Sequence, residues 1–109
     1  KIQPERMLAA ASDPALMATD LADELVKLGM PFRTAHHRVG ALVKWCRDHK
    51  KPLNELNLDE MQLTIPEAIA EFTKLFDPAV SIAKREITGA TGFKVVASRI
   101  KYWLEKLAV

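Results

Sequence analysis

The sequence predicts an all-α protein, a small helical bundle of about five to seven helices with no sheet. In most segments apolar residues recur every three or four positions, as on one face of a helix, and no segment shows the alternation of a half-buried strand. Residues 17–40 (MATDLADELVKLGMPFRTAHHRVG) contain a helix, its stop signal and the start of a second helix. We therefore expect the bundle to be built on a helix–Gly–Pro–helix hairpin.

The first helix of this hairpin carries three leucines on one face, Leu21, Leu25 and Leu28. Asp20 lies near its start, where the helix dipole favours an acid. Gly29 supplies the left-handed residue that commonly ends a helix. Pro31 prevents that helix from resuming and suits the first position of the next one. A tight turn between two packed helices is the expected result.

The second helix is expected over residues 31–50, closed by Pro52. Its apolar stripe should be buried: Phe32, Ala35, Val39, Leu42, Val43 and Cys46. Cys46 is the only cysteine, which excludes an internal disulfide and a zinc site built from several thiolates. Its place on this stripe favours a small buried hydrophobic residue over a reactive thiol.

Outside the hairpin the expected elements are shorter. Residues 5–11 form the end of a helix, and either Asp13, followed by Pro14, or Thr19 caps the next segment. Two brief turns bury Leu53, Leu56, Leu58 and Met61, with Asn57 capping the second. A helix from Pro66 carries Ile69, Phe72, Leu75 and Phe76. Asp77 and Pro78 then stop it and start another helix, which runs to about residue 87.

The final helix has the clearest apolar stripe of the chain: Phe93, Val96, Ile100, Trp103, Leu104 and Leu107. The preceding GATG, residues 89–92, is expected to be a joint in which Thr91 caps this helix. It is no phosphate loop, because it lacks the spacing and the lysine of those motifs and follows a helix.

Composition limits the classes of function. A chain of 109 residues with 49% hydrophobic and 28% charged residues is one ordinary globular domain. A net charge of +2 is too small to argue for nucleic acid, and the basic residues near the C-terminus are interpreted as a solvated face. Neither a membrane span nor a signal peptide is evident, so we expect a cytoplasmic protein. The first residue, Lys1, suggests a piece of something longer.

No residue is assigned to catalysis, to a cofactor or to a metal. The adjacent His36 and His37 point about 100° apart on a helix and cannot easily chelate one ion, and His49 is three turns further on. No serine, cysteine or carboxylate has a partner suited to nucleophilic or acid–base catalysis. The residues alone therefore indicate a helical module without an active site.

The run A-T-D-L-A-D-x-L-V-x-x-G-x-P-F-R-x-A-H-x-x-V-G resembles the C-terminal domain of argininosuccinate lyase. It occupies residues 18–26 and Gly29, Pro31, Phe32, Arg33, Ala35, His36, Val39 and Gly40. Further matches to this family are Leu53, Leu56, Leu58, Glu60, Phe76, Ser81, Arg85, Gly89 and Thr91. Ala90 and Gly92 depart from the family's glycine-glycine-threonine-alanine joint.

This resemblance implies a structural role for the matched residues. Gly29 and Pro31 form the turn, and Phe32 fills it as a plug. The side chain of Arg33 or His36 makes a polar contact with nearby carbonyls. It also implies that residues 1–12 are the stump of a long core helix and residues 13–109 the C-terminal helical domain. The family's enzymes are homotetramers that cleave argininosuccinate to arginine and fumarate. Their catalytic serine lies in S-S-x-M-P-x-K-x-N, a pattern that this sequence lacks.

We therefore expect an accessory domain of a lyase, inactive alone, whose partners are the other domains of the parent. The exposed Ile2, Met7 and Leu8 of the stump could form a homodimer of the fragment. Three alternatives stay open: a stand-alone protein-interaction module that uses the hairpin or the last helix, a divergent lyase with another substrate, and a small nucleic-acid-binding domain, which the low net charge disfavours.

Overall fold

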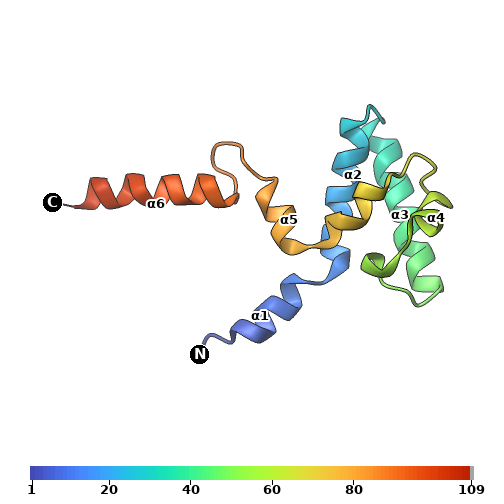
Figure 1. Ribbon diagram of the computed structural model, residues 1–109, viewed down its shortest axis with the longest axis horizontal. Coiled ribbons are helices and arrows are strands. Elements are labelled where there is room, and N and C mark those ends of the chain that lie inside the picture. The colour runs from blue at the N-terminus through green and yellow to red at the C-terminus, as the bar shows by residue number, and fades with distance from the viewer. Residues whose placement is uncertain (109) are drawn as a thin grey trace. The chain divides into compact units, whose positions relative to one another are not determined.

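The computed structural model describes residues 1–108, and within them all regular secondary structure is helical, with no strand (Figure 1). The elements in order are α1 (Pro4–Ala11), η1 (Pro14–Met17), α2 (Ala18–Lys27), α3 (Phe32–Asp48), η2 (Leu53–Glu55), α4 (Leu58–Gln62), η3 (Ala70–Phe76), α5 (Pro78–Ala83) and α6 (Phe93–Leu107), where η marks a 3-10 helix. The all-α prediction is confirmed. The chain divides into two compact units, residues 1–78 and 79–109.

The core of the first unit is formed where α2 packs along α3, with the 3-10 helices closing around the pair. Its buried side chains are Met17, Leu21, Ala22, Leu25, Ala35, Val39, Leu42, Cys46, Leu53, Leu56, Met61, Ile65, Ala68, Phe72, Leu75 and Phe76. Leu21, Leu25 and Leu42 are completely buried. Each such leucine stabilises the fold by about 1.5–3 kcal/mol relative to an exposed one. The predicted packing of the two hairpin helices is therefore confirmed.

The turn between α2 and α3 is a Schellman motif. Gly29 has a φ of 95°, in the left-handed region that favours glycine. The Gly29 amide donates to the Val26 carbonyl at 2.9 Å, and the Met30 amide donates to the Leu25 carbonyl at 3.1 Å. Pro31 then caps α3 from the position just before the first helical residue, one place earlier than predicted.

The end of α3 repeats this geometry without a glycine. The Lys50 amide donates to the Arg47 carbonyl at 3.2 Å, and the Lys51 amide donates to the Cys46 carbonyl at 2.9 Å. Lys50 itself has a φ of 51°. The helix consequently stops at Asp48, two residues before the predicted end.

Two apolar residues of the hairpin are not buried as predicted. The Phe32 side chain is 63% exposed, and its ring lies against the His36 ring with the centroids 4.2 Å apart. Phe32 is thus not a plug for the turn: its spacing puts it on the same face of α3 as Ala35 and Val39, but in the first turn of the helix this face is left uncovered. Leu28 is 59% exposed because it is the C-cap residue, where the chain leaves the helix. Val43 is only partly buried.

Two later helices are shorter than predicted. The segment after Pro66 becomes helical only at Ala70, as a 3-10 helix, and before it the Ala68 carbonyl accepts a hydrogen bond from the Gln62 side chain at 2.9 Å. Ile69 accordingly lies outside the helix and is exposed. Helix α5 ends at Ala83 rather than near residue 87, because the Arg85 carbonyl accepts from the Gly92 amide at 2.8 Å and closes a loop.

The second unit consists of α5, this closed loop and α6. Gly89 has a φ of 86°, and a Cβ on Gly92 would overlap the Arg85 carbonyl oxygen. A side chain at Gly89 would therefore be strained, and one at Gly92 would clash with the backbone. Gly92, without a side-chain hydrogen bond, is the N-cap of α6, so the predicted cap at Thr91 is wrong. No residue of α6 is buried within the chain.

Candidate functional site at the hairpin turn

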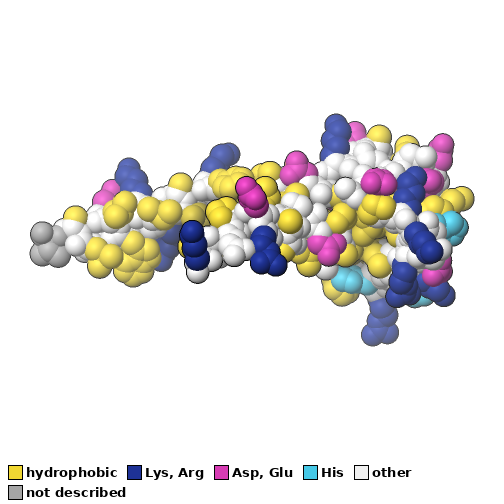
Figure 2. Space-filling model, turned by 90° about the horizontal axis from the view of Figure 1, so that it is seen from below, with side chains coloured by type: hydrophobic (Ala, Val, Ile, Leu, Met, Phe, Trp, Pro, Cys, Tyr) yellow, Lys and Arg dark blue, Asp and Glu magenta, His cyan; other side chains and the backbone are white. Residues whose placement is uncertain are grey.

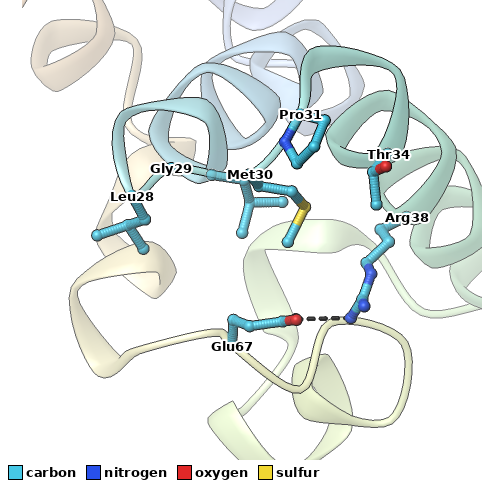
Figure 3. A pocket seen from close by; sticks show the side chains of 8 residues that line it. Leu28, Gly29, Met30, Pro31, Thr34, Arg38 and Glu67 are labelled. Atoms are coloured by element: carbon cyan, nitrogen blue, oxygen red, sulfur yellow. Dashed lines mark hydrogen bonds and ion pairs between the residues drawn. The ribbon is translucent and has the colours of Figure 1, made fainter.

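The hairpin turn forms one wall of a pocket in the first unit, with a volume of about 360 Å³ (Figure 3). Its lining residues come from the end of α2, the turn, the first half of α3 and the loop before η3: Leu25, Leu28, Gly29, Met30, Pro31, Thr34, Arg38 and Glu67. The Schellman geometry places apolar side chains on one side of the pocket, and Arg38 and Glu67 lie opposite (Figure 3). The pocket therefore combines an apolar wall with a charged one.

Arg38 and Glu67 join two segments that lie far apart in the sequence. The Arg38 Nη1 donates to the Glu67 Oε2 at 2.6 Å. The Arg38 side chain is 30% exposed and that of Glu67 is 48% exposed, so water screens the pair. Such a pair contributes at most about 1 kcal/mol. Its structural effect is to fasten the loop before η3 to the outer side of α3.

The polar groups of the pocket are few, and two of them form an ion pair. Its polar groups are the Thr34 hydroxyl, the guanidinium of Arg38 and the carboxylate of Glu67. Glu67 already accepts a hydrogen bond from Arg38, and a guanidinium is no base at neutral pH. Among the hydrogen bonds of the described residues, Arg38 is the partner of the Glu67 carboxylate, and none joins that carboxylate to the Thr34 hydroxyl.

A second polar cluster surrounds the start of α4. The Asn57 side chain accepts from the Glu60 amide at 2.8 Å, and the Glu60 carboxylate accepts from the Asn57 amide at 3.1 Å. This is a capping box, and it confirms Asn57 as the cap. Lys51 donates to the Glu60 carboxylate at 2.6 Å, which lowers the pKa of Glu60 below its ordinary value, with the Asn57 amide adding to the effect.

The nearby Cys46 is buried, as predicted. Burial raises the pKa of its thiol, the negative charge of Glu60 raises it further, and Lys51 partly opposes both effects. The thiol is therefore protonated at neutral pH and a poor nucleophile.

The structure does not gather the residues of the sequence motif into one site. Asp20 lies half-buried in the first turn of α2. Arg33, His36 and Gly40 are exposed on α3, and the His36 ring lies against the ring of Phe32. Ser81, Arg85, Gly89 and Thr91 belong to the second unit, where only Ser81 is buried.

Sequence reasoning missed the ion pairs of both clusters. Arg38 and Glu67 are 29 positions apart, and nothing local links them. Glu60 could have been found, because an asparagine followed three residues later by glutamate is the signature of a capping box.

Two further properties of the described residues limit what they can do. Within residues 1–108, no three His, Cys, Asp or Glu side chains lie close enough together to hold a metal ion. In the same part of the chain, every helix is too short or too polar to cross a membrane.

The fold and the turn thus define a class, a helical domain built on a hairpin that turns through a Schellman motif. The family model described as argininosuccinate lyase C-terminal matches residues 15–83. The chain belongs to the argininosuccinate lyase C-terminal family, within the fumarase/aspartase superfamily.

Individual relatives agree with this assignment. The chain is 43% identical over 102 residues to the argininosuccinate lyase of Chloroflexus aggregans, covering 94% of this chain and 22% of that protein. The lyase of Lawsonia intracellularis is 39% identical, with 91% of this chain and 22% of that protein covered. A solved variant of EDDS lyase with bound fumarate is similar to 95% of this chain, with a TM-score of 0.82 and 26% identity, over 23% of its own length. The chain therefore spans less than a quarter of its relatives.

Proposed function

We propose that this chain is the C-terminal domain of a longer lyase that cleaves argininosuccinate into arginine and fumarate. The observation that carries the proposal is the identity of about two residues in five to argininosuccinate lyases over more than nine-tenths of the chain. The chain covers only 22% of the first of these relatives, so the catalytic groups would belong to the remaining length. The pocket at the hairpin turn, which lacks a catalytic pair, supports an accessory role for this domain.

The exposed apolar surface at the start of the chain supports a division into the end of a core helix and a C-terminal domain. The helix α1 has no buried residue, and Ile2, Met7 and Leu8 are exposed. An apolar surface of this kind suits a helix that packs against other parts of a larger protein. Residues 1–12 would then end a long core helix, and residues 13–109 would form the C-terminal helical domain. The parent would be a cytoplasmic homotetramer, as the resemblance implies, and the isolated chain could pair through α1.

The hairpin residues shared with the family would act on structure. Gly29 and Pro31 set the turn between α2 and α3, and the exposed Arg33, His36 and Gly40 would face other parts of the parent. In the second unit, Gly89 and the Arg85 carbonyl would shape the joint before α6.

Release of fumarate, followed by its ultraviolet absorbance, tests the proposal. The parent protein should convert argininosuccinate, and residues 1–109 alone should stay at background, because this sequence lacks the serine-rich catalytic loop of the family. Turnover by the short chain would contradict the accessory role. A parent that is folded but leaves argininosuccinate intact would contradict the proposed substrate.

A lyase with another substrate is the second candidate. It is favoured by the structural similarity to EDDS lyase and by the departure of Ala90 and Gly92 from the family's joint. Assay of the same parent protein with other amino-substituted succinates, again through fumarate, separates it from the first candidate.

A further inference from the structure

The helix α6 carries an apolar face that the described residues of the second unit leave largely exposed. Its 15 residues include five apolar side chains spaced alternately three and four apart: Phe93, Val96, Ile100, Trp103 and Leu107. These are the a and d positions of two heptads, the spacing by which one helix packs along another. All five side chains are between 42% and 72% exposed. A single helix of this length is marginal in water without such packing.

The face is also shaped as a groove within the second unit, with a volume of about 470 Å³. Gly89 and Ala90 of the preceding loop form part of its wall, and the rest of the lining comes from Val96, Arg99, Ile100, Trp103, Leu104 and Leu107. Figure 2 shows hydrophobic side chains gathered along α6, at the left end of the view, with Lys and Arg side chains beside them. The long, shallow shape fits a helix better than a small molecule.

The two charged side chains that flank the groove, Arg99 and Lys106, are both positive. Helix α6 contains Lys94, Arg99, Lys101 and Lys106 but a single acid, Glu105. Arg99 and Lys106 occupy the g positions, which flank the apolar stripe and contact the flank of a partner helix. The Arg99 guanidinium lies 4.9 Å from the centre of the Tyr102 ring and 5.6 Å from that of Trp103, so it stays at the edge of the groove. A partner with acids at its facing flank would complement both cations.

A second copy of α6 is a poor match for this face. In an antiparallel pair the g positions meet, so Arg99 of one chain would oppose Lys106 of the other. Like charges placed opposite one another are destabilising. In a parallel pair each Arg99 would face Leu104, and the cations would find no acid. The helix α1, with eight residues, is too short to cover the length of α6.

We propose that α6 docks onto an acid-flanked amphipathic helix from the part of the parent lyase that lies outside this chain. The inference rests on the proposed function, because it requires the longer polypeptide that the relatives possess: this chain covers only 22–23% of them, and the matching family model describes their C-terminal part. The partner helix would run about 22 Å along α6, the length of its 15 residues. It would place apolar residues in the groove and Asp or Glu beside Arg99 and Lys106.

Hydrogen exchange of the α6 amides in the intact parent protein tests this docking. The α6 amides should exchange at least about tenfold more slowly in the parent than in residues 1–109 alone, because docking opposes opening of the helix. The double variant Arg99→Glu with Lys106→Glu, made in the parent, should remove most of this protection. The matched control, Lys94→Glu with Lys101→Glu, makes the same change of charge on the opposite side of α6 and should leave the protection in place.

Each other outcome contradicts the proposal. Equal exchange in the parent and the short chain would show that no helix covers α6. Equal loss of protection in both double variants would show that the flanking charges do not select the partner. Protection that rises with the concentration of the short chain would identify a second copy as the occupant. Argininosuccinate cleavage, measured on the same unsubstituted parent, keeps the two proposals distinct: a parent that cleaves the substrate with α6 unprotected refutes the docking alone.

Discussion

The two glycines of the hairpin, Gly29 and Gly40, differ in backbone conformation. Gly29 has a positive φ and stands at the turn, so a side chain there is strained. Gly40 lies in the exposed middle of α3 with ordinary helical geometry, and a Cβ on it would meet nothing within 4 Å. Within this chain, therefore, Gly29 is required by the fold and Gly40 is not.

This difference predicts opposite effects of the same substitution. Gly40→Ala should raise the free energy of unfolding by about 0.5–1 kcal/mol, because alanine loses less backbone entropy in a helix. Gly29→Ala should lower it by about 1–2 kcal/mol, because alanine is strained at a positive φ. Urea denaturation of both variants, followed by circular dichroism, measures the two changes. A destabilising Gly40→Ala would contradict the open space seen beside this residue.

The thiol of Cys46 is expected to react slowly in the folded protein. Its side chain is buried and its pKa is raised, so little thiolate is present at neutral pH. Reaction with an aromatic disulfide reagent should be slow in buffer and fast in urea. The matched control is Cys46→Ser with Ala41→Cys, which moves the thiol to an exposed position of the same helix. A rate for Cys46 equal to that of the control would show that the core opens readily.

Among the elements, α4 depends most on a few side chains. It has only five residues, too few to be stable by its own backbone hydrogen bonds. Asn57 and Glu60 form its capping box, and Lys51 links Glu60 to the end of α3. Asn57→Ala should therefore destabilise the chain by about 1 kcal/mol.

The same cluster predicts a dependence of stability on pH. The pKa of Glu60 is lowered in the folded chain by Lys51, so the unfolded chain binds this proton more readily. The contribution of Glu60 is complete above its ordinary pKa of 4.5 and is lost as the pH falls through the lower value of the folded state. Glu60→Gln should remove this part of the acid sensitivity, whereas Glu55→Gln, at an exposed position, should not. Urea midpoints measured from pH 7 downward, on both variants, give the comparison.

The elements also show what could be predicted from sequence. The spacing of Leu21 and Leu25, followed by Gly29, is enough to predict α2 and its end, because these signals are local. Phe32 lies three residues before the buried Ala35, on the same face of α3, but is exposed. Periodicity predicts which face of a helix is apolar, but it does not predict how much of that face other elements cover. The 3-10 helix η3 was predicted as an α-helix because, over seven residues, periods of 3.0 and 3.6 place Phe72 and Leu75 on the same side.

The candidate site was predictable only in part. Its apolar side, from Leu25 to Pro31, follows from the hairpin motif. Its charged side does not, because the pairing of Arg38 with Glu67 depends on the path of the loop between α4 and η3. The hydrogen bond from the Gln62 side chain to the Ala68 carbonyl helps to shape this loop, and the helical periodicity of the sequence does not predict such a bond.

At the scale of the whole molecule, burial is distributed unequally between the two units. Every buried hydrophobic side chain of the described residues lies between Met17 and Phe76, and α6 buries none. The cooperative stability of the chain should consequently reside in the first unit. The core joins α2, α3 and η3 through contacts between residues that are far apart in sequence. It should therefore unfold in a single cooperative transition.

Truncation tests this distribution. Residues 1–83 keep the first unit and α5 and should retain a cooperative urea transition whose slope is close to that of the full chain, because the slope scales with the surface exposed on unfolding and α6 contributes little. Residues 1–69 lose η3 and with it Phe72, Leu75 and Phe76, so their transition should be broad or absent. A sharp transition in the shorter piece would place the core in the hairpin alone. A collapse of the longer one would mean that the second unit stabilises the first, and the separation into two units would then fail in solution.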